Sequence, residues 1–153
     1  MGKLALVVMV VATLAACGTD SVSEVSPDPL AGMINGQPFT FVGGETNPFL
    51  SEGDDNFFSD LYGETYTACG FSHPSGPHLI ASIPMTPGEY TLSLDLNMTF
   101  TYNDGSTVQN LIATRGRLVV DEVTSTTVTG GLHGIYNGDN EVDGQFSLTV
   151  CTQ

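Results

Sequence analysis

Apolar and polar residues alternate without a break from Tyr90 to Tyr102. Every second position is apolar, and the positions between them carry Thr, Ser, Asp or Asn. A strand places alternate side chains on one face, whereas a helix would spread these apolar groups around its circumference. The stretch therefore predicts either one long strand or two strands that keep their phase through a bend near residues 95–97.

Shorter patterns of the same kind continue along the chain. The pair Asn35-Gly36 lies between two short apolar runs, which predicts a hairpin with a two-residue turn. Residues 43–55 are rich in Gly, Asn and acidic side chains and predict a long loop, residues 57–69 have strand character, and residues 70–77 predict a second loop. Further strands are expected over residues 78–84, 107–114, 115–123, 126–136 and 144–151.

These patterns predict an all-β fold. No segment after residue 17 shows the apolar spacing of a helix over three turns. Eight or nine short strands separated by turns are typical of a single antiparallel β-sandwich or jelly-roll, and a closed β-barrel is the alternative. The length leaves room for one such domain, which we place at residues 30–153.

The first residues have the order of an export signal. Lys3 is followed by an apolar run over residues 4–13 and then by the small residues Ala15 and Ala16, directly before Cys17. The apolar run is shorter than the roughly 20 residues that a membrane-spanning helix requires. The sequence Leu14-Ala15-Ala16-Cys17 resembles the lipobox of bacterial lipoproteins. An ordinary secretory signal with an accidental cysteine is the competing interpretation.

The resemblance to lipoproteins implies a processing scheme and an address. Residues 1–16 would be removed as a signal peptide, and Cys17 would become the lipidated first residue of the mature protein. Residues 17–29 are polar, acidic and interrupted by prolines, which predicts a flexible tether. Gly18 follows the cysteine, where an aspartate would signal inner-membrane retention, so the family's sorting rule implies the outer membrane, on either its periplasmic or its surface side.

The charge of the chain is strongly negative. The sequence contains 17 acidic residues against three Lys and Arg. If Lys3 leaves with the signal, Arg115 and Arg117 face all 17 acids, and the mature side-chain charge is −15. Such a charge disfavours nucleic acid and anionic lipid headgroups as partners. It is consistent with solubility or with binding of a divalent cation.

The cysteine count predicts one disulfide. Of three cysteines, Cys17 is assigned to the lipid, so Cys69 and Cys151 remain as an even pair in an oxidising compartment. Both share the phase of the polar residues in their expected strands, so we expect a bridge between outward faces or strand ends.

One acidic segment is a candidate for calcium. Residues 139–144 begin like a calcium-binding loop, with carboxylates at Asp139, Glu141 and Asp143 and a glycine in the sixth position. The twelfth position is Val150, where an EF-hand needs a bidentate carboxylate, so a hairpin turn is the main interpretation. Further ligands would come from Glu52, Asp54 and Asp55. No other cofactor is expected.

The remaining candidate groups do not form a recognisable catalytic motif. The spacing of His73, His78 and His133 matches no common zinc-ligand pair. Hydroxyl groups lie near the histidines in sequence at Ser72 and Ser75, but a Gly-x-Ser-x-Gly nucleophile elbow is absent. The two arginines share a strand face, where they would bind a carboxylate or sulfate or pair with nearby acids. We expect the protein not to be an enzyme.

The sequence thus predicts an envelope-anchored lipoprotein with a non-enzymatic β-domain that binds an unidentified ligand through its loops. Its expected partners are the membrane, through the lipid anchor, and an envelope protein or glycan. The alternatives are a structural or assembly accessory of the outer membrane and a calcium- or carbohydrate-binding module.

Overall fold

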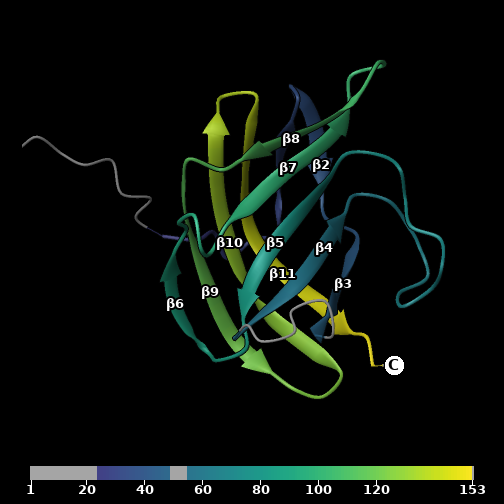
Figure 1. Cartoon of the computed structure of the whole chain (residues 1–153). Helices are drawn as coiled ribbons and strands as arrows, with labels where there is room; N and C mark the ends of the chain where they lie inside the picture. Colours follow the sequence, from purple (N-terminus) through teal and green to yellow (C-terminus); the bar gives the residue numbers. More distant parts are fainter. Residues whose placement is uncertain (1–23, 49–54, 153) are drawn as a thin grey trace, which may run out of the picture.

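A computed structural model describes residues 24–48 and 55–152, whose strands form one curled mixed sheet shaped like a half-barrel (Figure 1). The all-β prediction is confirmed. The sheet order is β6-β9-β10-β11-β3-β4-β5-β7-β8, and a β1–β2 hairpin is added on β11. Within the described residues, no helix is long and apolar enough to cross a membrane. The strands are β1 (Ala31–Ile34), β2 (Gln37–Thr40), β3 (Gly43–Asn47), β4 (Asn56–Tyr62), β5 (His78–Pro84), β6 (Gly88–Thr91), β7 (Met98–Asn103), β8 (Val108–Ile112), β9 (Arg115–Val123), β10 (Thr127–Asn137) and β11 (Asn140–Val150).

Strand β11 connects the parts of this sheet. It pairs along its length with β10, and its other edge is shared between β1 at the start and β3 at the end. The β11–β3 pair is parallel, whereas the other pairs of named strands are antiparallel, so the sheet is mixed and not purely antiparallel as predicted. Thr149 lies opposite Glu45 in this parallel pair, which places β3 beside the C-terminal end of the chain.

The predicted Asn-Gly hairpin joins β1 to β2. Asn35 has φ 51° and Gly36 has φ 67°, the left-handed conformation that a two-residue turn of this type requires. Gly32 on β1 lies so close to β11 that a Cβ atom there would be 2.0 Å from the Glu141 carbonyl oxygen. The hairpin is therefore packed tightly against the sheet.

The long alternating stretch forms two strands that belong to different parts of the sheet. β6 pairs with β9, whereas β7 pairs with β5 and β8. The apolar phase is kept on both sides of the connection, since Leu92, Met98 and Phe100 are all buried. Leu94, at the turn between the strands, is 85% exposed. The two-strand interpretation is correct, and the sheet curls enough to bury both segments in one core.

The core lies inside the curl and receives side chains from most strands. Its centre is shielded from solvent, because many of its members have no exposed surface at all. The buried cluster comprises Leu30, Ile34, Phe39, Phe57, Leu61, Leu79, Ala81, Ile83, Leu92, Met98, Phe100, Leu118, Val120, Val128, Leu132, Val142, Phe146 and Leu148.

Three predicted boundaries are wrong. The segment expected to be a loop at residues 43–55 begins with strand β3. Its middle residues Gly44, Glu45 and Thr46 are all buried, so apolar and polar residues do not alternate and the strand is not recognisable in the sequence. The strand expected over residues 57–69 ends at Tyr62, and residues 63–77 form a loop. The turn between the strands expected at residues 126–136 and 144–151 is shorter than predicted, because β10 and β11 leave only residues 138–139 between them.

The described chain begins inside the segment predicted as a tether. From Glu24 to Pro29 this segment lies along β10 and β11. The Ser26 N–H donates to Asp143 Oδ1 at 2.9 Å, and Gln145 Nε2 donates to the Ser26 carbonyl oxygen at 2.6 Å. These contacts show that the last part of the tether is docked on the sheet. The signal peptide, Cys17 and the calcium candidates Glu52 and Asp54 lie outside the described residues.

Candidate functional site

The loop between β4 and β5, residues 63–77, extends from one side of the half-barrel (Figure 1, right). It is joined to the end of β11 through Cys69 and Cys151, the pair predicted to form a disulfide. Their sulfur atoms are 2.06 Å apart and their Cα atoms 5.4 Å apart. The parity argument behind the prediction was wrong for Cys69, which lies in a turn with φ 61° and not in a strand.

A buried carboxylate on the sheet also contacts the same loop. Glu45 on β3 is only 2% exposed. Its Oε2 accepts a hydrogen bond of 2.6 Å from the Cys69 N–H, and its Oε1 lies 3.1 Å from Nε2 of His73. These two contacts compensate part of the desolvation of the carboxylate. Glu45 therefore links the central sheet to two points of the loop.

Aromatic rings pack at the base of the loop. The Tyr62 ring, at the end of β4, meets Tyr66 edge-on at 4.7 Å and lies 6.1 Å from His73 and 5.4 Å from His78. Burial raises the pKa of both tyrosines, and the nearby carboxylates of Asp60 and Glu45 raise it further. Both phenols are therefore neutral, and the Tyr66 hydroxyl is buried without a hydrogen-bond partner among the described residues.

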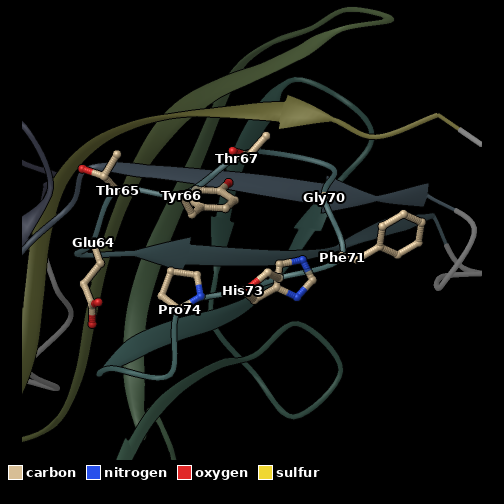
Figure 2. A pocket seen from close by; sticks show the side chains of 9 residues that line it. Glu64, Thr65, Tyr66, Thr67, Gly70, Phe71, His73 and Pro74 are labelled. Carbon is tan, nitrogen blue, oxygen red and sulfur yellow. The ribbon is translucent and has the colours of Figure 1, made fainter.

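The loop encloses a hollow of about 370 Å³ (Figure 2). This volume falls at the lower end of the range of small-molecule sites. Phe71 lies at one end of the hollow and is fully exposed, and Glu64 lies at the other end. The lining residues are Glu64, Thr65, Tyr66, Thr67, Gly70, Phe71, Ser72, His73 and Pro74.

The lining of the hollow is mostly polar, with aromatic rings among the polar groups. Its lining supplies hydroxyls, one exposed carboxylate and aromatic rings, and it includes no Lys or Arg. Neither Ser72 nor Ser75 forms a hydrogen bond with an imidazole in the described chain, since Nε2 of His73 faces Glu45 and Nδ1 of His78 lies 2.9 Å from the Gly76 carbonyl oxygen. The paired nucleophile and base of covalent catalysis are thus not formed here.

The calcium candidates are not gathered in one place. Glu141 and Asp143 are neighbours on β11 and both face His133 on β10, at 3.3 Å and 3.8 Å, while Asp139 lies in the exposed turn. The three histidines do not converge either. Among the described residues, the only potential metal-ligand atoms that gather in a group of three or more within 4.8 Å belong to Glu45, Cys69 and Cys151.

The two arginines lie on β9, away from the β4–β5 loop in the sheet order. Arg117 forms an ion pair with Glu89 on the neighbouring strand β6. Pairing with a nearby acid was one of the two interpretations of the arginines from the sequence. Arg115 precedes it on the same strand, with one residue between them.

Sequence reasoning missed most of this site. Glu45 lies in a stretch of Gly, Thr and acids that reads as loop, and Phe71 is one apolar residue within a Gly- and Pro-rich segment. The one usable signal was the predicted Cys69–Cys151 pair, because it brings residues near 69 to the C-terminal strand.

No family model, no curated protein and no solved structure matches this chain. The fold and the residues of the site are therefore the basis for inferring what the protein does.

The half-buried Asp60, on β4 beside this site, makes the stability pH-dependent. Burial raises the pKa of Asp60 above its usual 3.8, and this effect outweighs the lowering by His78. Folding thus favours the protonated form of Asp60. The stability that this form contributes is fully present below the pKa of Asp60 in the unfolded chain and is lost as the pH rises through its pKa in the folded chain. We expect Asp60→Asn to raise the melting temperature at pH 7 and to leave it nearly unchanged at pH 3.

Thermal melts of both proteins at pH 3, 5 and 7 measure this effect. The matched control is Asp95→Asn, which removes an exposed carboxylate in the turn between β6 and β7 and should give no comparable gain. A gain for Asp60→Asn that is larger at pH 3 than at pH 7 would contradict the assignment.

Proposed function

We propose that this chain is a lipid-anchored protein of the bacterial envelope whose β-domain is a non-enzymatic binding module, with the β4–β5 loop as its binding surface. One observation carries the proposal. A disulfide and the buried carboxylate of Glu45 fix this loop to the sheet, and the fixed loop presents the fully exposed Phe71 beside a hollow. A preorganised loop loses little conformational entropy when it binds.

The position of the loop supports this assignment. The described chain begins at Glu24, beside Glu89 of β6 and Arg117 of β9, whereas the β4–β5 loop lies on the opposite side of the sheet (Figure 1). Seven residue steps separate Cys17 from Glu24, so they span at most about 25 Å. A lipid on Cys17 would hold the domain near the bilayer with the loop directed away from it.

Binding is favoured over catalysis by the composition of the hollow. Its polar groups are not paired as nucleophile and base, and its exposed aromatic ring is the kind of side chain that dominates binding energy at interfaces. A negative chain with this surface suits an envelope component that is neutral or positively charged.

The anchor is tested by Cys17→Ser in the full-length chain, expressed in a bacterial host. We expect the unchanged protein to enter the detergent phase of a detergent–water partition and the variant to remain in the aqueous phase, because two or more acyl chains give stable membrane attachment. Mass spectrometry of the N-terminal peptide identifies the modification. An unmodified Cys17 with the leader retained, and an aqueous unchanged protein, would rule out the anchor.

A carbohydrate-binding module is the second candidate function. It is favoured by the combination of aromatic rings with hydroxyls and a carboxylate at the hollow, since ring faces carry apolar contacts and the polar groups fix orientation. A glycan array probed with and without calcium, with Phe71→Ala as the control, separates this candidate from a protein-binding module.

An assembly accessory of the outer membrane is favoured by a different feature. Strand β8 ends the sheet order, and its residues Val108 and Ile112 are 61% and 48% exposed. An exposed edge of this kind can pair with a strand of another protein. If crosslinking to envelope proteins is abolished by Val108→Lys and unchanged by Phe71→Ala, this function replaces the proposed one.

A further inference from the structure

The carboxylate of Glu45 lies beside the disulfide. A carboxylate oxygen of Glu45 and the sulfur atoms of Cys69 and Cys151 all lie within 4.8 Å of one another. His73 lies outside this group of three, but its Nε2 is 3.1 Å from Oε1 of Glu45. Two sulfurs, a carboxylate and an imidazole are ligand types that zinc takes in proteins.

The buried carboxylate is the unusual part of this cluster. A disulfide between a loop and a strand end is neutral and gains nothing from a negative charge beside it. Keeping Glu45 at 2% exposure is nevertheless unfavourable, and one backbone N–H with one half-exposed imidazole offsets only part of the desolvation. A divalent cation would neutralise this carboxylate together with two thiolates, which gives the charge a role.

The chain also has suitable spacing and support for such a site. Cys69 and His73 are separated by three residues, a spacing within the range found for neighbouring zinc ligands. Of the other two ligands, Glu45 is in the middle of β3 and Cys151 directly follows β11, where its N–H donates to the Thr46 carbonyl oxygen at 2.9 Å. One pair of ligands is thus fixed by the sheet, and the other lies on the β4–β5 loop, which the disulfide no longer holds once it is reduced.

We propose that opening of the Cys69–Cys151 bridge creates a zinc site formed by Cys69, Cys151, Glu45 and His73. A dithiol reductant supplies two electrons and two protons: its own sulfurs become a disulfide, the Cys69–Cys151 bond breaks, and each cysteine sulfur receives a proton. One Zn²⁺ then binds and displaces both protons to solvent. In tetrahedral geometry the two sulfurs lie about 3.8 Å apart, a separation that a shift of the Cys69 turn supplies.

The zinc site and the disulfide use the same two sulfur atoms, so the chain can form only one of them at a time. The oxidised chain holds the loop by a covalent bond and the reduced chain holds it by a metal. The binding surface at Phe71 would be supported in both states. The inference concerns the cluster beneath the loop and does not depend on the ligand of the hollow.

The test uses the whole chain, with its bridge intact or reduced by a phosphine without oxygen, and Co²⁺ as the spectroscopic probe. We expect the reduced chain to bind one Co²⁺ with the sulfur-to-metal charge-transfer absorption and tetrahedral ligand-field bands of a thiolate site, to release two protons, and to exchange Co²⁺ for Zn²⁺. The oxidised chain should show none of these signals. Circular dichroism before and after metal addition reports whether the reduced chain is folded.

Variants separate a built site from two loose thiols. Glu45→Gln and His73→Ala should each weaken Co²⁺ binding by about tenfold or more, since even outer-shell partners of a metal contribute that much. His78→Ala should leave it unchanged, because this imidazole is close to the same Tyr62 ring but contacts the Gly76 carbonyl oxygen and not Glu45. If the reduced chain unfolds without metal, Glu45-dependent refolding on Zn²⁺ addition supports the site. Absence of the thiolate absorption, or equal affinity in Glu45→Gln and the unchanged chain, would overturn it.

Discussion

Replacing Cys69 and Cys151 together with alanine is expected to lower the free energy of unfolding by about 4–5 kcal/mol. The two cysteines are 82 residues apart, and in the chain-entropy model closing so long a loop restricts the unfolded chain by roughly this amount. A small domain with a total stability of about 5–15 kcal/mol loses a large fraction of it.

Urea unfolding of the double variant and of the oxidised chain measures the difference. The unchanged chain with its disulfide reduced should also be less stable than the oxidised chain in metal-free buffer, since the same covalent link is removed. Equal unfolding midpoints for the double variant and the oxidised chain would contradict the assignment of this bridge as the main support of the C-terminal end.

Phe100→Ala is expected to destabilise the domain by about 3–5 kcal/mol, whereas the same truncation at Phe71 should change stability by less than about 0.5 kcal/mol. Phe100 lies on β7 with 0% exposure inside the curl, so its removal leaves a cavity that the neighbouring strands cannot fill. Phe71 is fully exposed and supports no packing.

Thermal and urea melts of both variants provide the comparison, with circular dichroism to show that each remains folded before melting. A large loss of stability on Phe71→Ala would mean that this ring is part of the structure and not of a binding surface. A small loss on Phe100→Ala would place the core elsewhere.

Alternation and turn residues were sufficient to predict much of the sheet. The predicted strands at residues 78–84 and 115–123 coincide with β5 and β9, and the Asn35-Gly36 turn has the expected left-handed residues. These strands have one buried face and one partly exposed face, which is the condition under which period-two patterns are informative. Strand β3 was missed because its middle residues are buried on both faces and include a carboxylate.

The order of the strands and the curvature of the sheet could not be predicted from the sequence and are known only from the structure. The alternating stretch from Tyr90 to Tyr102 gives no sign that its halves belong to opposite parts of the sheet, because pairing partners are set by tertiary contacts and not by local pattern. The parallel contact of β11 with β3 was likewise not predictable, although it brings Glu45 and Cys151 together.

The site itself could be predicted only at its cysteines. Pairing followed from counting, but the groups that surround the bridge come from three separate segments, with Glu45 on β3, His73 in the loop and Cys151 after β11. Only the folded chain brings them within reach of one another. The acidic residues 139–144, by contrast, suggested calcium by composition, but Glu141 and Asp143 lie on β11 and contact His133.

The most direct test of the proposed function is binding of residues 17–153 to envelope fragments of the proposed bacterial host, prepared from cells that lack the protein. The three proteins compared are the unchanged chain, Phe71→Ala, and Leu94→Ala as the control at another exposed apolar residue. Loss of a central aromatic contact of about 2 kcal/mol predicts binding at least 30-fold weaker for Phe71→Ala, with Leu94→Ala unchanged. Equal binding by Phe71→Ala and the unchanged chain would contradict the β4–β5 loop as the binding surface.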